Sequence, residues 1–188
     1  MPGLAEGNPQ GDRELLKELV RERSFKFGSF ILSSGKESTY YFDGKQVTLY
    51  PQGAYLVARA ILEKVKDIKI QAIGGPMLGA DPMVGSLGPV LYLKGMDLKL
   101  FIVRGTAKTH GTKRFIEGPQ LLTGDRVVII DDVITSGGSI IRAIETVQEV
   151  GCNVVKVVTL IDRREGGTEK IEKMGIKVDP IFDIKDFI

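Results

Sequence analysis

Apolar residues in the first third of the chain follow helical and hairpin patterns. Between Asp12 and Arg23, leucine and valine recur at helical spacing, and Asp12 is a candidate N-cap. Two apolar and aromatic segments, 30–32 and 39–42, flank the polar residues 33–36, which predicts a β-hairpin. Pro51 then fits the first turn of a second helix. Its apolar face is predicted to be Ala54, Val57, Ile61 and Val65.

From residue 68 onward, short apolar runs alternate with helical segments. The runs predict strands at 68–73, 98–103, 126–130 and 154–161. A short helix is expected after the glycine-rich residues 74–80, and another at 139–150, ended by Gly151. This alternation predicts βαβ units and an α/β fold whose mainly parallel sheet has helices on both faces. We expect one domain over residues 1–188, with residues 1–10 flexible.

Composition narrows the possible classes of protein. The net charge is only +2, so nothing in the bulk charge indicates a nucleic-acid or membrane partner. The N-terminal residues lack the pattern of a signal peptide, and no apolar stretch is long enough to span a bilayer. A single cysteine, Cys152, excludes an internal disulfide. These features predict a cytoplasmic protein.

The strongest chemical signal follows the third predicted strand. Asp131 and Asp132 stand at its carboxyl end, where open α/β sheets bind ligands. The next residues are rich in hydroxyls and glycine, and they lead into a helix whose first N–H groups can hold a phosphate. The two carboxylates repel phosphate but suit sugar hydroxyls or Mg²⁺. The segment therefore predicts a sugar-phosphate site formed by Asp131, Asp132, Val133, Ile134, Thr135, Ser136, Gly137, Gly138 and Ser139.

Other interpretations of this segment fit less well. A plain strand-to-helix turn with an aspartate cap would not need two aspartates, three hydroxyls and two glycines in nine residues. There is no lysine in the frame of a nucleoside-triphosphate loop. There is also no G-x-G-x-x-G motif of a dinucleotide fold.

A polar segment at 105–118 has almost no apolar anchor. It contains Lys108, the only histidine, His110, and further cations at Lys113 and Arg114, with glycines at 105, 111 and 118. A solvated charged loop is the plain interpretation. A cationic lid that orders over a diphosphate would also explain its length and its glycines.

Residues 128–139 resemble the signature of type I phosphoribosyltransferases, which bind 5-phosphoribosyl 1-diphosphate (PRPP). The resemblance implies that the loop holds the ribose 5-phosphate and that Asp131 and Asp132 engage the ribose hydroxyls. It also implies the fold of that family, with a small N-terminal hairpin region, and Mg²⁺ bound mainly through PRPP, with Asp131 or Asp132 as a further ligand.

Four further features resemble the orotate branch of this family. They are Thr135, the hairpin segment 27–43, the loop 104–111 and the strand end 160–167. The resemblance implies that Thr135, Arg163, Tyr41 and Phe42 contact orotate. It implies that Arg104, Lys108 and His110 bind PRPP and, with the two aspartates, form the catalytic set. Without the resemblance, the sequence would indicate that Arg163 is a surface partner of Asp162 or Glu165. Tyr41 and Phe42 would then be ordinary core residues.

The chain departs from this branch at three positions. Gly105, Ser33 and Leu78 stand where well-known bacterial members have lysine.

The resemblance also implies a homodimer whose lid covers the partner's site. A purine or uracil phosphoribosyltransferase and a non-catalytic PRPP-sensing regulator are the alternatives.

Overall fold

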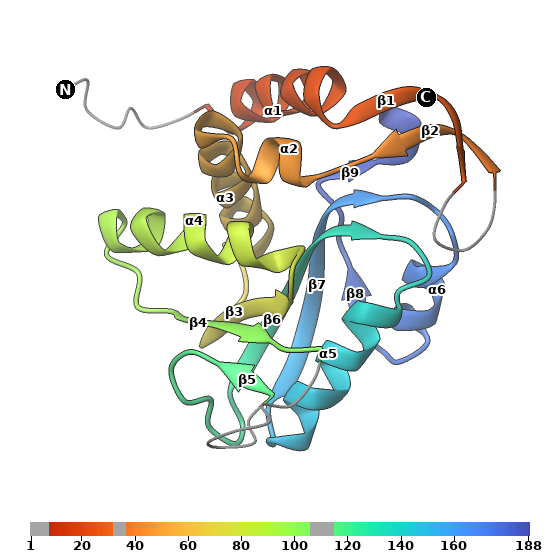
Figure 1. Cartoon of the computed structure of the whole chain (residues 1–188). Coiled ribbons are helices and arrows are strands. Elements are labelled where there is room, and N and C mark those ends of the chain that lie inside the picture. Colours follow the sequence, from red (N-terminus) through yellow and green to blue (C-terminus); the bar gives the residue numbers. More distant parts are fainter. Residues whose placement is uncertain (1–7, 32–36, 106–114) are drawn as a thin grey trace.

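The computed structural model describes residues 8–31, 37–105 and 115–188, and its centre is a mainly parallel sheet (Figure 1). In the described part the sheet has seven strands, in the order β5-β4-β3-β6-β7-β8, with β9 also paired to β7. Only β5 is antiparallel to its neighbour. The strands are β3 (Ala72–Pro76), β4 (Lys99–Val103), β5 (Ile116–Glu117), β6 (Arg126–Ile134), β7 (Asn153–Asp162), β8 (Lys177–Val178) and β9 (Phe182–Asp183). The α/β prediction is confirmed.

Helices cover both faces of the sheet, and the strand side chains, which alternate in direction, pack into a core on each face. On β6, Val128 and Ile130 face a core shared with α1 (Pro9–Arg23), α3 (Pro51–Val65) and α4 (Ala80–Leu93). Val127 and Ile129 face the opposite core, with α5 (Gly138–Glu149) and α6 (Gly167–Glu172). Figure 1 shows the two helical layers on either side of the strands.

The first helix begins earlier than the sequence predicts. Asn8 is its N-cap and accepts a hydrogen bond from the backbone N–H of Gln10 at 3.2 Å. Asp12 is therefore not the cap, and its carboxylate accepts instead from Arg59 Nε at 2.6 Å. Pro9 and Gln10, expected in the flexible N-terminus, are already helical, while residues 1–7 lie outside the described residues.

The strand predicted at 68–73 is displaced toward the glycines. β3 includes Gly74 and Gly75, because neighbouring strands approach there too closely for a side chain. A Cβ on Gly74 would lie 2.1 Å from the carbonyl oxygen of Phe101. On Gly75 it would lie 1.9 Å from that of Ile130. The following helix, α4, has 14 residues and is not short.

The N-terminal hairpin pairs β1 (Phe25–Ile31) with β2 (Glu37–Phe42), as predicted, while its turn at 32–36 lies outside the described residues. A four-residue helix that the sequence did not indicate, α2 (Lys45–Thr48), follows it. The hairpin and α2 lie toward the end of the sheet where β6 and β7 finish (Figure 1). The chain ends in a short 3-10 helix, η1 (Ile184–Asp186). No helix in the described ranges is long and apolar enough to cross a membrane.

Candidate active site

The acidic pair lies within β6, which extends four residues beyond the predicted strand to Ile134. Asp131 and Asp132 are only 5% and 3% exposed. Successive strand residues point to opposite faces, so the two carboxylates have different neighbours. Asp131 Oδ2 accepts a hydrogen bond from Ser139 at 3.3 Å, and Asp132 Oδ2 accepts one from Lys45 Nζ at 2.9 Å.

Lys45 is a site residue that sequence reasoning missed. It begins α2, and its ammonium group forms an ion pair with a carboxylate 87 residues later in the chain. A single lysine after Asp43-Gly44 belongs to no motif, and only the packing of α2 against the strand end reveals its role.

Burial changes the pKa values of two groups at this site. Burial, reinforced by the charge of Asp132, raises the pKa of Asp131 to about 8. Burial lowers the pKa of Lys45, but the hydrogen bond and the charge of Asp132 outweigh it, and the net shift is upward. At neutral pH and without ligand, Asp131 therefore carries a proton. A protonated carboxyl group can both donate to and accept from a sugar diol.

Glycine backbone lies directly against the acidic pair. A Cβ on Gly79 would lie 2.1 Å from Asp131 Oδ1 and 2.5 Å from Asp132 Oδ1. A Cβ on Gly44 would lie 3.0 Å from the Cβ of Asp132. Both carboxylates thus have one oxygen beside Gly79, at the segment that joins β3 to α4. Leu78, one of the three departures from the orotate branch, is exposed in that segment.

The predicted phosphate loop has the required backbone geometry. Gly137 adopts a left-handed conformation (φ 79°) as the N-cap of α5, a position that suits glycine. The first N–H groups of α5, from Gly138 onward, have no acceptor within the helix and can bind an anion. The loop also packs against the start of α6, where a Cβ on Gly167 would lie 2.5 Å from the carbonyl oxygen of Thr135.

Arg163 follows β7 beside this loop, and its backbone N–H donates to the carbonyl oxygen of Ile134 at 3.0 Å. Its side chain is 9% exposed, and its guanidinium carbon lies 5.0 Å from the ring centroid of Tyr40. Nε lies 3.0 Å from Glu165 Oε1 but makes no hydrogen bond to any described residue. The structure thus contains a buried, incompletely bonded cation at the strand end, which suits an anionic ligand.

The predicted aromatic pair is separated. Phe42 is buried in the core, 5.3 Å from the ring of Phe25, whereas Tyr41 is 44% exposed and lies 5.9 Å from Phe30. The ring next to Arg163 belongs to Tyr40, which sequence reasoning did not single out. Strand alternation is the signal that could have found it, because neighbouring strand residues cannot share a face.

Arg104 directly follows β4 and precedes the predicted lid. Its Nη1 donates to Glu117 Oε1 at 3.3 Å, and its backbone N–H donates to the carbonyl oxygen of Phe115 at 2.8 Å. β5 lies within the segment predicted to be a lid and pairs with β4, so residues 104 and 115 are adjacent. A cavity of about 170 Å³ lies here, lined among others by Arg104, Arg142 and Ser139. Lys108, His110, Lys113 and Arg114 lie outside the described residues.

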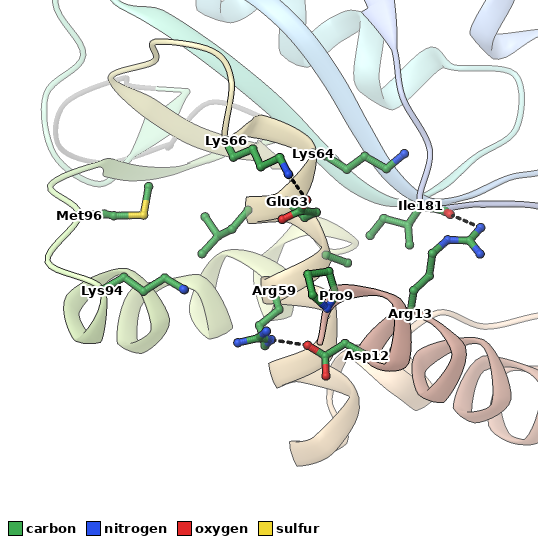
Figure 2. Close-up of a pocket in the computed structure, with 12 residues that line it drawn as sticks. Pro9, Asp12, Arg13, Arg59, Glu63, Lys64, Lys66, Lys94, Met96 and Ile181 are labelled. Atoms are coloured by element: carbon green, nitrogen blue, oxygen red, sulfur yellow. Dashed lines mark hydrogen bonds and ion pairs between the residues drawn. The ribbon is translucent and has the colours of Figure 1, made fainter. Parts of the chain in front are cut away.

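A larger pocket of about 290 Å³ lies between α1, α3 and the residues after α4 (Figure 2). Several of its basic residues are already paired, Arg59 with Asp12 and Lys66 with Glu63. None of residues 131–139 lines it, and neither Arg104 nor Arg163 does. The candidate active site is therefore the strand end at Asp131, Asp132 and Arg163.

Comparison with known proteins agrees with this geometry. The pattern of the family described as "Phosphoribosyl transferase domain" matches residues 43–187. The orotate phosphoribosyltransferase of Aquifex aeolicus is 42% identical over 180 residues, covering 94% of this chain and 98% of that protein. The one from Nostoc is 41% identical over 174 residues, covering 93% and 84%. This chain belongs to the orotate phosphoribosyltransferase family.

Solved structures of the family have the same fold. The Mycobacterium tuberculosis orotate phosphoribosyltransferase, crystallised with Fe(III) dicitrate, matches with a TM-score of 0.82 at 38% identity, covering 94% of this chain and 98% of that one. A crystal structure of the same enzyme with PRPP matches with a TM-score of 0.78 at 35% identity. The expectations of a phosphoribosyltransferase fold and of the orotate branch are confirmed.

Proposed function

We propose that this orotate phosphoribosyltransferase binds orotate and PRPP at the carboxyl ends of β6 and β7. It would transfer the 5-phosphoribosyl group to orotate, giving orotidine 5′-monophosphate and diphosphate in the synthesis of UMP. The observation that carries the assignment of the site is the position of the buried Arg163 next to the phosphate loop and the acidic pair. One strand end thus offers a diol site, a phosphate site and a carboxylate site together.

The ribose phosphate is assigned to β6 and its loop. Asp131 and Asp132 bond the ribose hydroxyls, and the backbone of 133–139 with the hydroxyls of Thr135, Ser136 and Ser139 holds the 5-phosphate. Lys45 Nζ donates to Asp132 Oδ2 at 2.9 Å and holds that carboxylate in place. Gly44 and Gly79 let the backbone pack directly against the carboxylates, and this close contact fixes their position.

Orotate is assigned to the space between the hairpin and the end of β7. The guanidinium of Arg163 can meet the orotate carboxylate with two parallel hydrogen bonds. Thr135 offers a hydroxyl without adding negative charge. Tyr40 supports Arg163 from one side, and Phe42 contributes through the core beneath it. Tyr41, on the opposite face of the strand, is not assigned a contact with orotate.

The catalytic contribution is mainly electrostatic. Displacement at the anomeric carbon develops positive charge on the ribose and negative charge on the departing diphosphate. We assign Arg104, Lys108 and His110 to the diphosphate, where cations stabilise the developing charge. Orotate is already a nitrogen nucleophile as its anion, so no general base or covalent nucleophile is assigned.

Mg²⁺ is the expected cofactor. Within the described ranges no three His, Cys, Asp or Glu side chains form a metal site, but Asp131 and Asp132 each have one oxygen beside Gly79. Two carboxylate oxygens fit an ion that takes its remaining ligands from PRPP and water. When bound, Mg²⁺ would neutralise charge on the diphosphate. We also assign the chain to the cytoplasm, in keeping with its single buried, free cysteine.

Diphosphate release with a panel of bases tests this function. Incubation with PRPP and Mg²⁺ should release diphosphate with orotate and far less with hypoxanthine, adenine or uracil. Better turnover with any of those three would favour the purine or uracil alternative. PRPP binding without release for every base would favour the non-catalytic regulator.

A homodimer is proposed as the active form. One face of α4 exposes Gly85, Pro89, Tyr92 and Leu93, with Tyr92 84% exposed. Asp81, in the first turn of the same helix, has a buried carboxylate oxygen without a hydrogen-bond partner among the described residues. An apolar helix face with a buried, unbonded acceptor suits contact with a second copy.

Mixing two inactive variants tests whether the lid acts across the dimer. Asp132→Asn and Lys108→Ala are unfolded together and refolded as a mixture. Random pairing gives about half mixed dimers, and each regenerates one intact site if the lid serves the partner. Activity should then recover to roughly a quarter of wild type. A mixture that stays inactive would place Lys108 in the site of its own subunit.

A further inference from the structure

The direction of the Arg163 side chain depends on the turn that carries it. Its Nε has no hydrogen bond within the described structure, its ring contact with Tyr40 is weakly directional, and its ion-pair partner, Glu165 at 3.0 Å, belongs to the same turn. Arg163 lies at the start of the turn that joins β7 to α6. The conformation of that turn therefore decides where the guanidinium points.

Asp162 holds the turn at two points. Its side chain is buried, and Oδ1 accepts from the backbone N–H of Arg164 at 2.7 Å. Oδ2 accepts from the hydroxyl of Thr168, in the first turn of α6, also at 2.7 Å. One carboxylate thus bonds residues on both sides of the turn's tip.

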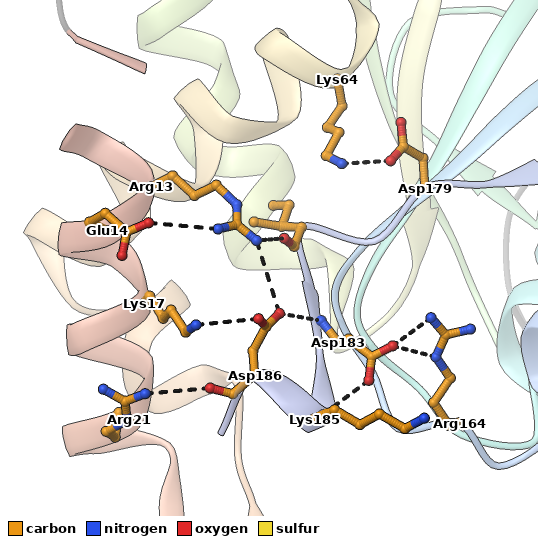
Figure 3. A network of polar contacts seen from close by, with 11 residues as sticks. Arg13, Glu14, Lys17, Arg21, Lys64, Arg164, Asp179, Asp183, Lys185 and Asp186 are labelled. Atoms are coloured by element: carbon orange, nitrogen blue, oxygen red, sulfur yellow. Dashed lines mark hydrogen bonds and ion pairs between the residues drawn. The ribbon is translucent and has the colours of Figure 1, made fainter. Parts of the chain in front are cut away.

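Arg164 fastens the turn to a separate part of the fold. It is the only non-glycine residue in the described ranges with a positive φ, 57°, a conformation that is unfavourable for an L-residue. Its guanidinium donates to the carboxylate of Asp183 in β9. Figure 3 shows this pair continuing to Asp186, which accepts from the backbone N–H of Asp183 and from Lys17 of α1. The turn is thereby tied to the C-terminal residues and to the first helix.

The same turn is bonded to the phosphate loop. The backbone N–H of Gly167 donates to the carbonyl oxygen of Thr135 at 2.9 Å, and Lys170 Nζ donates to that of Ser136 at 3.2 Å. With the bond from Arg163 N–H to Ile134, three contacts fix the turn and the α6 helix that follows it relative to residues 134–136. These hydrogen bonds therefore determine the distance between the proposed carboxylate site and the proposed ribose phosphate site.

We infer that Arg164 is a positioning residue for orotate recognition and that it acts through Arg163. The ion pair of Arg164 with Asp183 holds the turn in the left-handed conformation that points Arg163 at the base site. This inference rests on the proposed role of Arg163 and adds the ion pair that orients its guanidinium group. Arg164 itself contacts no substrate.

Arg164→Gly and Arg164→Lys test the inference, with Michaelis constants measured separately for orotate and PRPP. Glycine adopts the left-handed conformation without a Cβ clash, so the first variant loses the ion pair at little cost in folding. We expect its KM for orotate to rise between about three-fold and ten-fold, the scale of coupling between neighbouring side chains. KM for PRPP and the melting temperature should change little. Arg164→Lys keeps one charged contact with Asp183 and should recover part of the loss.

The same change in an Arg163→Ala background separates this inference from the proposed function. If Arg164 acts through Arg163, Arg164→Gly should have no further effect on orotate there. An unchanged KM for orotate in the single variant would overturn the positioning role while leaving Arg163 in place. So would an equal rise for both substrates, a large fall in melting temperature, or an effect that persists without Arg163. An Arg163→Ala variant with normal KM for orotate would instead refute the proposed orotate site, and this inference with it.

Discussion

Replacing Asp132 by asparagine is expected to reduce turnover with PRPP by about a hundred-fold or more, with only a small change in melting temperature. A ribose hydroxyl loses a charged acceptor, and losing one such preorganised contact typically costs on this scale. Folding is affected less, because asparagine has nearly the same shape. The former partner, Lys45, has a side chain 39% exposed and can be solvated. Steady-state kinetics and thermal unfolding of the same preparation measure both effects.

Asp125→Asn is the matched control for this variant. Asp125 is also a buried aspartate paired with a lysine, Lys99 Nζ at 2.8 Å, and it accepts from the backbone N–H of Leu122 at 2.9 Å. It lies at the opposite end of β6, next to Arg126. Its loss should lower the melting temperature and leave turnover intact. The reverse outcome, an unstable but normally active Asp132→Asn, would mean that the acidic pair serves the fold and not the substrate.

Gly79→Ala is expected to abolish most activity through a single methyl group. The added Cβ would lie 2.1 Å from Asp131 Oδ1 and 2.5 Å from Asp132 Oδ1, so at least one carboxylate must leave its position. Overpacking at a buried site typically costs about 1–3 kcal/mol of stability as well. Activity and thermal unfolding of the purified variant should both fall.

Gly88→Ala, nine residues later in α4, is the comparison. Its Cβ would make an ordinary contact, 3.6 Å from Leu100 Cδ1. Alanine stabilises a helix interior by about 1 kcal/mol relative to glycine, so this variant should be active and at least as stable as wild type. Full activity in Gly79→Ala would contradict the close approach of that glycine to the acidic pair.

The sheet and the loop could be predicted because their signals are local. A buried apolar run, two aspartates and a glycine-rich helix start lie within one short segment, and each element has its own periodicity. The shift of β3 toward Gly74 shows where such reasoning fails. The apolar pattern predicts a strand only where the side chains are apolar. In β3, the close approach of the neighbouring strands requires glycine at Gly74 and Gly75 instead.

Residues that act across the fold could not be predicted in the same way. Lys45 meets Asp132 only because α2 packs over the end of β6. Tyr40, instead of Tyr41 or Phe42, lies beside Arg163 because the register of the hairpin decides which face turns inward. The ion pair of Arg164 with Asp183 depends on β9, 19 residues farther along the chain, and no spacing in the sequence encodes it.

The ratio of kcat/KM for orotate to that for uracil, measured for wild type and Arg163→Ala, tests the central claim most directly. Uracil is orotate without the carboxylate, so it reports every contact except the one assigned to Arg163. We expect the variant to lose about thirty-fold or more with orotate, equivalent to about 2 kcal/mol for a buried charged contact, and to change little with uracil. The ratio should therefore fall by the same factor. An unchanged ratio, with both substrates affected alike, would contradict the assignment of Arg163 as the residue that recognises orotate.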